Sequence, residues 1–150
     1  MIGRVVYDGA DRHLKVFRDD GALIYVARCR NDSVSPIAWR SWAGCPPGEY
    51  TIGAPEANTT PQDQTEMGPW FVPVYGIPDH VGIGIHGGGS CAGDHAMDPH
   101  QGWCPTENCF REQNADLDVF VDLLQKENVF PIKFTVVQPD EEPAESEEFL

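Results

Sequence analysis

The residues best suited to chemistry lie between positions 86 and 111, in a stretch with almost no aliphatic side chains. The stretch begins with His86, at the end of an apolar run, and closes on Cys109 and Arg111. A cysteine nucleophile needs a base or a positive neighbour that favours its thiolate, and backbone N–H groups directed at the oxyanion. This pattern suits a Cys109 nucleophile with His86 as its base. The alternative is a buried Cys109 that packs as a small hydrophobe, beside a satisfied core histidine.

Three glycines follow the histidine directly, at positions 87–89. Glycine has no Cβ, so another chain can come close to its backbone. We therefore expect this run to let a peptide substrate approach the backbone next to His86.

A metal site or a disulfide is the other chemistry that this stretch offers. Zinc prefers imidazole and thiolate ligands, but the spacing here lacks the tight C-x₂-C knuckle of familiar zinc fingers. Cys91 and Cys104 are alternatively placed to form a disulfide that braces the loop. We predict no resident metal or cofactor, and the zinc alternative would draw on six residues: His86, Cys91, His95, His100, Cys104 and Cys109.

The overall charge excludes several classes of partner. The chain has 150 residues with 10 basic and 24 acidic side chains, a net charge of −14. Nucleic-acid and anionic-membrane binding both depend on Lys and Arg, so neither is expected. No apolar run is long enough to span a bilayer, and the first residues, which lack a long apolar stretch, are not expected to be a secretory signal. We thus expect synthesis in the cytoplasm, and the odd count of five cysteines disfavours a disulfide scaffold.

The elements that must position these residues are mostly strands. β-rich or alternating segments, bounded by turn signals, predict strands. One amphipathic helix is predicted near residues 114–127, with Asn114 as its N-cap and Leu117, Phe120, Val121 and Leu124 on one face. The polar segment 54–67 shows no period and is interpreted as a loop. The strands are predicted at 5–7, 13–18, 22–28, 49–52, 70–75, 81–86 and 131–137.

The chain divides into one domain, residues 1–137, and an acidic tail, residues 138–150. The tail holds six acidic residues and no basic one. A segment of this composition cannot bury enough apolar surface to fold, so we expect it to be disordered.

The central stretch resembles the catalytic signature of the L,D-transpeptidase family. The similarity is carried by Ile-Gly-Ile-His-Gly at positions 83–87 and by Thr-Glu-Asn-Cys-Phe-Arg at 106–111. Asn114 and Asp116 follow, as in the Asn-x-Asp segment of that family. Leu-Lys-Val-Phe at 14–17 is similar to its opening strands, and Pro-Pro-Gly-Glu-Tyr-Thr-Ile-Gly at 46–53 to its Pro-x-Gly-x-Tyr/Phe segment. The resemblance covers about residues 4–137.

The resemblance implies a β-sandwich-like L,D-transpeptidase fold and a thiol enzyme that acts on peptidoglycan stem peptides. Cys109 would be the nucleophile, His86 its base, and Gly87 the residue whose backbone orients the histidine. A thioester would form at the diamino acid of stem position three and pass to an amine or to water. Contacts to the substrate are predicted for four residues: Arg111, Gly88, Trp103 and Asn108.

Two features depart from the family pattern. The glycine before the cysteine is Asn108 here, and Asn tolerates a positive φ next best after glycine. The 22 residues between His86 and Cys109 form a longer loop than is usual, and we expect it to be a lid. The alternative function is a non-catalytic binding module or a phage or virion structural module with the same fold. A phage particle or a dedicated secretion machine would bring the chain to the cell wall, the periplasm or a virion.

Overall fold

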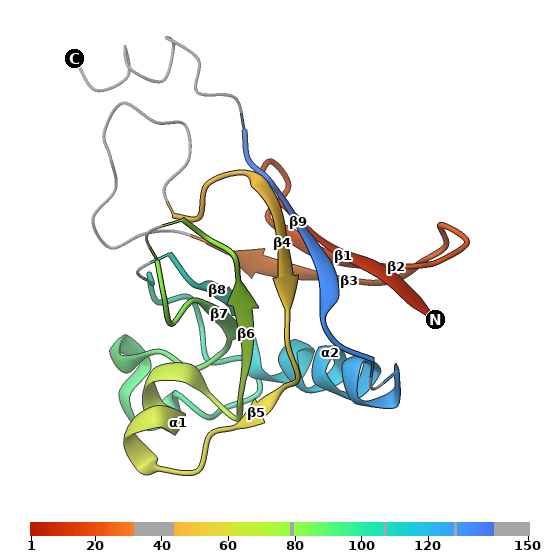
Figure 1. Ribbon diagram of the computed structural model, residues 1–150. Helices are drawn as coiled ribbons and strands as arrows, with labels where there is room; N and C mark the ends of the chain where they lie inside the picture. The colour runs from red at the N-terminus through yellow and green to blue at the C-terminus, as the bar shows by residue number, and fades with distance from the viewer. Residues whose placement is uncertain (32–43, 79, 107, 128, 140–150) are drawn as a thin grey trace, which may run out of the picture.

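One large sheet organises the molecule, and two α-helices pack beside it (Figure 1). The computed structural model describes residues 1–31, 44–78, 80–106, 108–127 and 129–139. The helices are α1 (Pro61–Met67) and α2 (Asn114–Glu127), and a 3₁₀ helix, η1, spans Ser90–His95. The strands are β1 (Ile2–Asp8), β2 (His13–Arg18), β3 (Leu23–Arg30), β4 (Gly48–Ile52), β5 (Glu56–Ala57), β6 (Trp70–Tyr75), β7 (Gly84–His86), β8 (Phe110–Glu112) and β9 (Ile132–Val137).

The sheet closes on itself. Its strand order is β4-β9-β1-β2-β3-β8-β7-β6-β5, and β4 also pairs with β6. Most neighbours are antiparallel, but β1 pairs with β9 and β7 with β8 in parallel. Closure removes most free strand edges, and the inward-facing side chains become the core. The predicted mostly β architecture is therefore confirmed.

Helix α2 covers one side of the sheet (Figure 1). Leu117, Phe120, Val121 and Leu124 are buried, so the predicted apolar stripe is confirmed. Burial of each such side chain stabilises the fold by about 1.5–3 kcal/mol. The Phe120 ring lies 5.7 Å from the ring of Tyr25 on β3. The buried stripe thus anchors α2 on the sheet. The helix begins directly after β8, the strand that follows the candidate nucleophile Cys109.

The loop prediction for residues 54–67 is wrong, because β5 and α1 lie there. The Thr60 side chain caps α1 by accepting a hydrogen bond from the Asp63 N–H at 3.1 Å, and Pro61 opens the first turn. Both are ordinary signals for the start of a helix. No residue of α1 is buried. The helix therefore has no apolar period, and periodicity alone does not predict it.

The strand predicted at 81–86 is shorter than expected. Only Gly84–His86 is strand, because Val81 is 96 % exposed and Gly82 has φ 73°. The sequence suggested a close backbone approach at both glycines, and this holds for Gly84 alone. A Cβ on Gly84 would lie 2.8 Å from the backbone carbonyl oxygen of Val72 and would overlap the ring of Phe71, whereas one on Gly82 would meet open space.

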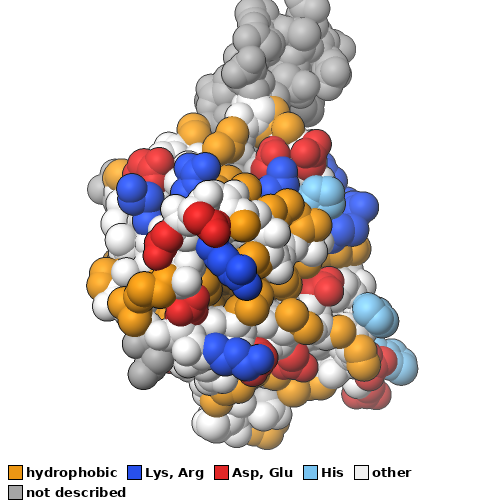
Figure 2. Space-filling view, turned by 90° about the vertical axis from the view of Figure 1, so that its right-hand side faces the viewer, with side chains coloured by type: hydrophobic (Ala, Val, Ile, Leu, Met, Phe, Trp, Pro, Cys, Tyr) orange, Lys and Arg blue, Asp and Glu red, His pale blue; other side chains and the backbone are white. Residues whose placement is uncertain are grey.

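The surface carries charges of both signs. Figure 2 shows one face, on which Lys and Arg side chains lie interspersed with Asp, Glu and apolar groups. No helix in the described ranges has the length and apolarity to cross a bilayer. Most of the predicted disordered tail, residues 140–150, lies outside the described residues. Gln138, the first residue of that predicted tail, is described and donates hydrogen bonds to Asn31 and to the Cys45 carbonyl, so the prediction of disorder is wrong for this residue.

Candidate active site

Parallel pairing of β7 with β8 brings the two ends of the central stretch together. In this register Ile85 lies opposite Phe110, and His86 lies opposite Arg111. Ile85 and Phe110 are fully buried in the core. Side chains alternate between the faces of a strand, so His86, Arg111 and the preceding Cys109 share the opposite face. Residues that are 23 or more positions apart in the sequence therefore meet on one side of the sheet.

These side chains line a common cavity of about 560 Å³. Helix α1 forms one wall through Glu66 and Met67, and the segment after β7 forms another. A cavity of this size suits a small molecule or a few residues of a peptide. Its lining is His86, Cys109, Arg111, Glu66, Met67, Ser90, Cys91, Cys104, Pro105 and Thr106.

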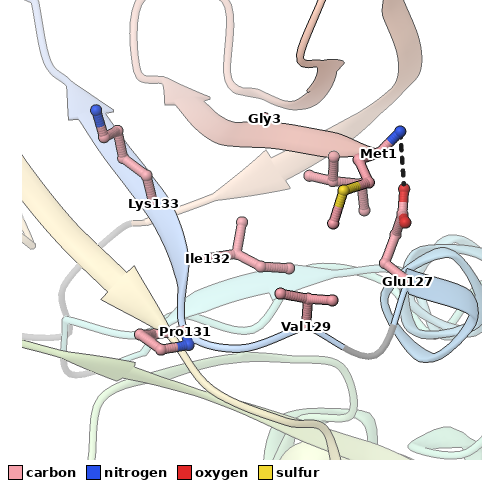
Figure 3. Close-up of a pocket in the computed structure, with 8 residues that line it drawn as sticks. Met1, Gly3, Glu127, Val129, Pro131, Ile132 and Lys133 are labelled. Atoms are coloured by element: carbon pink, nitrogen blue, oxygen red, sulfur yellow. Dashed lines mark ion pairs between the residues drawn. The ribbon is translucent and has the colours of Figure 1, made fainter.

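Two other hollows lack the groups for such chemistry. A cavity of about 100 Å³ lies beside β1 and β9, where the Met1 amine is 3.6 Å from Glu127 (Figure 3). A shallow groove of about 570 Å³ lies between β4, β6 and β9, beside Tyr75 and Lys133. Neither is lined by a cysteine or a histidine. The cavity at Cys109 is therefore the candidate site.

His86 is held in one orientation and one tautomer. Its Nδ1 lies 2.9 Å from the Gly87 carbonyl oxygen, and its ring stacks on Phe71 with centroids 6.1 Å apart. A carbonyl only accepts hydrogen bonds, so Nδ1 carries the proton and Nε2 keeps its lone pair. The pKa of His86 is lowered to about 4, chiefly by burial; the Gly87 bond opposes this shift and the Arg111 charge adds to it. The imidazole is thus neutral at pH 7, as a base must be.

Cys109 is the most available thiol among the cysteines outside the disulfide. Cys29 and Cys45 are fully buried, and burial raises the pKa of Cys45 to about 12. Cys109 is half-buried, and its Sγ lies 3.8 Å from the Gly82 carbonyl oxygen. Nucleophilic cysteines are accessible and lie in positive surroundings, whereas buried ones are inert.

Arg111 provides the positive charge beside that thiol. Burial lowers the pKa of Arg111 to about 10, while the nearby Cys109 acts in the opposite direction. The guanidinium is still charged at pH 7, and the same attraction favours the thiolate of Cys109. Its two terminal nitrogens donate to the Cys104 carbonyl at 2.6 Å and the Glu66 carbonyl at 3.2 Å. Arg111 therefore also ties the loop after β7 to α1.

The loop between His86 and Cys109 is built as a structured lid, which we define as residues 88–106. It contains η1, and a disulfide joins Cys91 to Cys104 with Cα atoms 5.9 Å apart. The disulfide alternative is thus the one observed, and it uses two of the six proposed zinc ligands. Among the residues described, no three His, Cys, Asp or Glu side chains converge as a metal site would require.

Buried amides anchor the lid to the start of α2. Asn114 donates from Nδ2 to the Ala96 and Asp98 carbonyls at 2.8 and 2.7 Å, and its Oδ1 accepts from the Gly88 N–H at 3.0 Å. Gln101 donates to the Glu112 carbonyl at 2.9 Å and accepts from the Asn114 N–H at 2.8 Å. The predicted N-cap role of Asn114 is wrong: it is the first residue of α2, and its side chain holds the lid. Sequence reasoning missed Gln101 because an isolated Gln in a loop carries no local signal.

The glycine run packs against the protein's own chain. The N–H groups of Gly87 and Gly89 donate to the Met67 and Thr65 carbonyls, both at 2.8 Å. A Cβ on Gly88 would overlap the backbone of Gly68. These glycines thus bring the lid close to α1, and their N–H groups are used within the chain.

Trp103 and Asn108 also lie off the cavity wall. Trp103 packs on Arg30, whose guanidinium carbon is 5.5 Å from the ring centroid. Asn108 has φ 73°, the left-handed conformation that glycine normally supplies and that Asn tolerates best among other residues. The predicted positive φ at Asn108 is therefore confirmed. Substrate contacts by Gly88, Trp103 and Asn108 stay predictions.

Removing the lid disulfide should destabilise the protein measurably. The bridge closes a loop with a sequence separation of 13, for which chain entropy predicts a contribution of about 3 kcal/mol. We expect the double variant Cys91→Ser/Cys104→Ser to melt roughly 5–10 °C below wild type in a thermal scan. A reductant should lower the wild-type melting temperature similarly and leave the double variant unchanged. Equal melting of both proteins would refute the prediction.

A buried acid lies on β8 next to the site residues. Glu112 is fully buried, and the Tyr25 hydroxyl contacts both its carboxyl and the Asp116 carbonyl, the latter at 3.0 Å. A hydroxyl has one proton, so a protonated Glu112 completes both bonds by donating to the Tyr25 oxygen. Burial raises the pKa of Glu112 to about 8, although the Tyr25 bond acts in the opposite direction.

Glu112 should make the protein less stable as the pH rises. Its pKa is about 8 when folded and 4.5 ordinarily, so the folded state holds the extra proton between those values. The shift at His86 acts only below pH 6.5, which leaves Glu112 dominant above it. The free energy of unfolding of wild type, measured with urea, should therefore fall by about 2 kcal/mol from pH 6.5 to 8, and Glu112→Gln should remove this dependence on pH. An unchanged slope in the variant would disprove the assignment.

Comparison with known proteins supports the fold. No protein-family model and no curated protein matches the sequence. Among solved structures, the helical cell shape determining protein Pgp2 from Campylobacter jejuni is similar with a TM-score of 0.61 at 17 % identity, over 93 % of this chain and 50 % of that one. L,D-transpeptidase (Yku) from Stackebrandtia nassauensis gives 0.53 at 17 % identity, over 91 % and 56 %.

L,D-transpeptidase 1 from Mycobacterium tuberculosis is also similar, with a TM-score of 0.52 at 11 % identity, over 89 % of this chain and 60 % of that one. The chain thus spans about half to three-fifths of the length of these proteins. Identities this low are evidence for the fold alone. The closed sheet with its cysteine–histidine cavity has the L,D-transpeptidase fold.

Proposed function

We propose that the protein is a cysteine acyl transferase or hydrolase that acts on peptidoglycan stem peptides through a thioester. The observation that carries the proposal is the shared cavity, with Cys109, His86 and Arg111 on one face of paired strands. The fixed tautomer of His86 leaves Nε2 as the basic nitrogen. Two of the similar structures are themselves L,D-transpeptidases, which supports a peptidoglycan substrate.

The proposed reaction begins with proton transfer from the Cys109 thiol to Nε2 of His86. The thiolate then attacks the carbonyl carbon of the diamino acid at stem position three, and the Arg111 charge stabilises the negative site. Collapse of the tetrahedral intermediate breaks the C–N bond, and His86 returns its proton to the departing D-amino acid. The remaining thioester passes its acyl group to an amine or to water. The first gives a cross-link and the second a shortened stem.

The lid disulfide favours an oxidising compartment. Structural disulfides persist outside the reducing cytoplasm. We therefore propose that the chain works in the cell wall, the periplasm or a virion. Delivery there by a phage particle or a secretion machine stays part of this proposal.

A muropeptide assay tests the function directly. A disaccharide tetrapeptide is incubated with the protein, with and without an acceptor amine, and the products are measured by mass spectrometry. We expect release of the terminal D-amino acid and an intact-protein mass that includes the acyl group on Cys109. Absence of both, from a folded protein with its lid disulfide intact, would reject the proposal.

A non-catalytic binding or virion module is the second candidate. The observation in its favour is the burial of His86, which is only 4 % exposed. An iodoacetamide titration separates the two functions. A nucleophilic Cys109 should react faster than a simple thiol, whereas a structural one should not.

A further inference from the structure

A buried asparagine outside the cavity contacts the backbone of the candidate nucleophile. Asn31 directly follows β3 and is 3 % exposed. Its Nδ2 donates to the carbonyl oxygens of Asn108 and Cys109, both at 2.8 Å. Its Oδ1 accepts from the Cys45 N–H at 2.7 Å and from Gln138 Nε2 at 3.0 Å.

These contacts use the full hydrogen-bonding capacity of an amide. A side-chain amide has two donor protons and an oxygen with two lone pairs. Both partners of Nδ2 are carbonyls and both partners of Oδ1 are N–H donors, so the network itself assigns the orientation of the group. Asp keeps only the acceptor half of this set, and an aliphatic residue keeps none of it. The position is therefore matched to Asn.

Two neighbouring residues complete the arrangement. Gly44 has φ 121°, and a Cβ there would overlap the Asn31 carbonyl. On the other side, the Thr106 hydroxyl donates to the Cys109 carbonyl at 2.7 Å. The Cys109 carbonyl thus receives two donors, one from Asn31 and one from Thr106.

Holding this carbonyl fixes the peptide plane that leaves Cys109. The bond to the Asn108 carbonyl fixes the peptide plane between Asn108, whose φ is 73°, and Cys109. With both planes held, the direction of the Cys109 side chain is set before any substrate binds. Preorganisation of this kind matters because a misplacement of about 1 Å can lower a rate about 10²-fold.

We propose that Asn31, with Thr106 on the same carbonyl, is a positioning residue that aims the Cys109 thiol. Asn31 does not line the cavity, so it acts through Cys109 and touches no substrate. The proposal rests on the proposed function for its catalytic meaning. It goes beyond that function by assigning the orientation of the nucleophile to a residue 78 positions away in the sequence.

The first test is Asn31→Asp, which keeps the acceptor and sets an oxygen against two carbonyl oxygens. We expect kcat for release of the D-amino acid to fall roughly 10- to 100-fold with KM within about twofold. The iodoacetamide rate at Cys109 should fall about tenfold at pH 7, with its pH profile moved upward. Gln138→Ala is the matched control. It removes a partner of Asn31 but keeps both bonds to the cysteine loop, so wild-type rates are expected.

A second pair of variants, at Thr106, introduces no charge and tests the contact with the same Cys109 carbonyl if Asn31→Asp fails to fold. Thr106→Val removes the hydroxyl, and Thr106→Ser retains it. We expect the Val variant to lower kcat and the alkylation rate roughly fivefold or more, and the Ser variant to restore both. A folded Thr106→Val that matches wild type in both rates overturns the proposal, whether or not Asn31→Asp folds.

The alkylation rates separate this proposal from the proposed function. Alkylation reports the thiol and needs no muropeptide. A wild-type protein that releases no D-amino acid refutes the function, and the ratio of alkylation rates between wild type and variants still decides the role of Asn31.

Discussion

Cys109→Ala should abolish release of the terminal D-amino acid, lowering kcat/KM by roughly 10³-fold or more. Cys109 is the half-buried thiol on the cavity wall, whereas Cys29 and Cys45 are sealed in the core. Loss of the sulfur removes the atom that forms the thioester, so no acylated protein should be detected by mass.

The fold should survive this change, because Cys109 is not fully buried and takes no part in the disulfide. Cys29→Ala is the matched control. It removes a core sulfur at a cost of about 1 kcal/mol in unfolding free energy and should keep activity within a few-fold of wild type. A Cys109→Ala protein that still releases the D-amino acid at the wild-type rate would end the cysteine mechanism.

His86→Gln should lower kcat/KM by roughly 10²- to 10⁴-fold, because it removes the Nε2 lone pair. Gln retains an amide that can donate to the Gly87 carbonyl, so the strand end should be preserved. His95→Gln is the matched control. His95 lies in the lid with a side chain 78 % exposed, and it pairs with Asp98, away from the cavity wall. Equal activities of the two variants would contradict the role of His86.

His86→Gln should also change how the stability of the protein depends on acid pH. Burial lowers the pKa of His86 to about 4 from its ordinary 6.5, so the unfolded state binds the extra proton between those values. The His86 shift should therefore lower the free energy of unfolding by roughly 2 kcal/mol or more as the pH falls from 6.5 to 4, while the raised pKa of Glu112 acts in the opposite direction over the same range. The His86 contribution is measured as the difference between wild type and His86→Gln in urea unfolding, and this difference should change by that amount between the two pH values. An equal dependence on pH in both proteins would exclude His86 as its source.

Local patterns were enough for much of the fold. The apolar stripe of α2 and the alternation of β2 and β9 are visible in the sequence because one face of each element is buried. They failed where burial was absent or the element was short. Helix α1 buries nothing, and β8 has only three residues, so neither produces a period.

The candidate site also has features that the sequence indicates and features that it does not. Strand-end His86 and the Cys-x-Arg spacing of Cys109 and Arg111 indicate thiol chemistry from residue types and spacing alone. The left-handed backbone at Asn108 was also foreseeable, since Asn is the residue that replaces glycine there at least cost. The zinc and disulfide alternatives were not separable, because the distance between two cysteines depends on the folded loop.

The sequence by itself indicated the candidate side chains Cys109, His86 and Arg111, because residue type and spacing are local properties of the chain. Only the tertiary structure decided that β7 and β8 are parallel neighbours, which places His86 opposite Arg111. It also decided that Asn31 holds the carbonyl of Cys109 and that the imidazole of His86 is buried. Strand pairing and side-chain amide hydrogen bonds join segments that are distant in the sequence. The free energy that favours these contacts is gained only when the whole sheet closes.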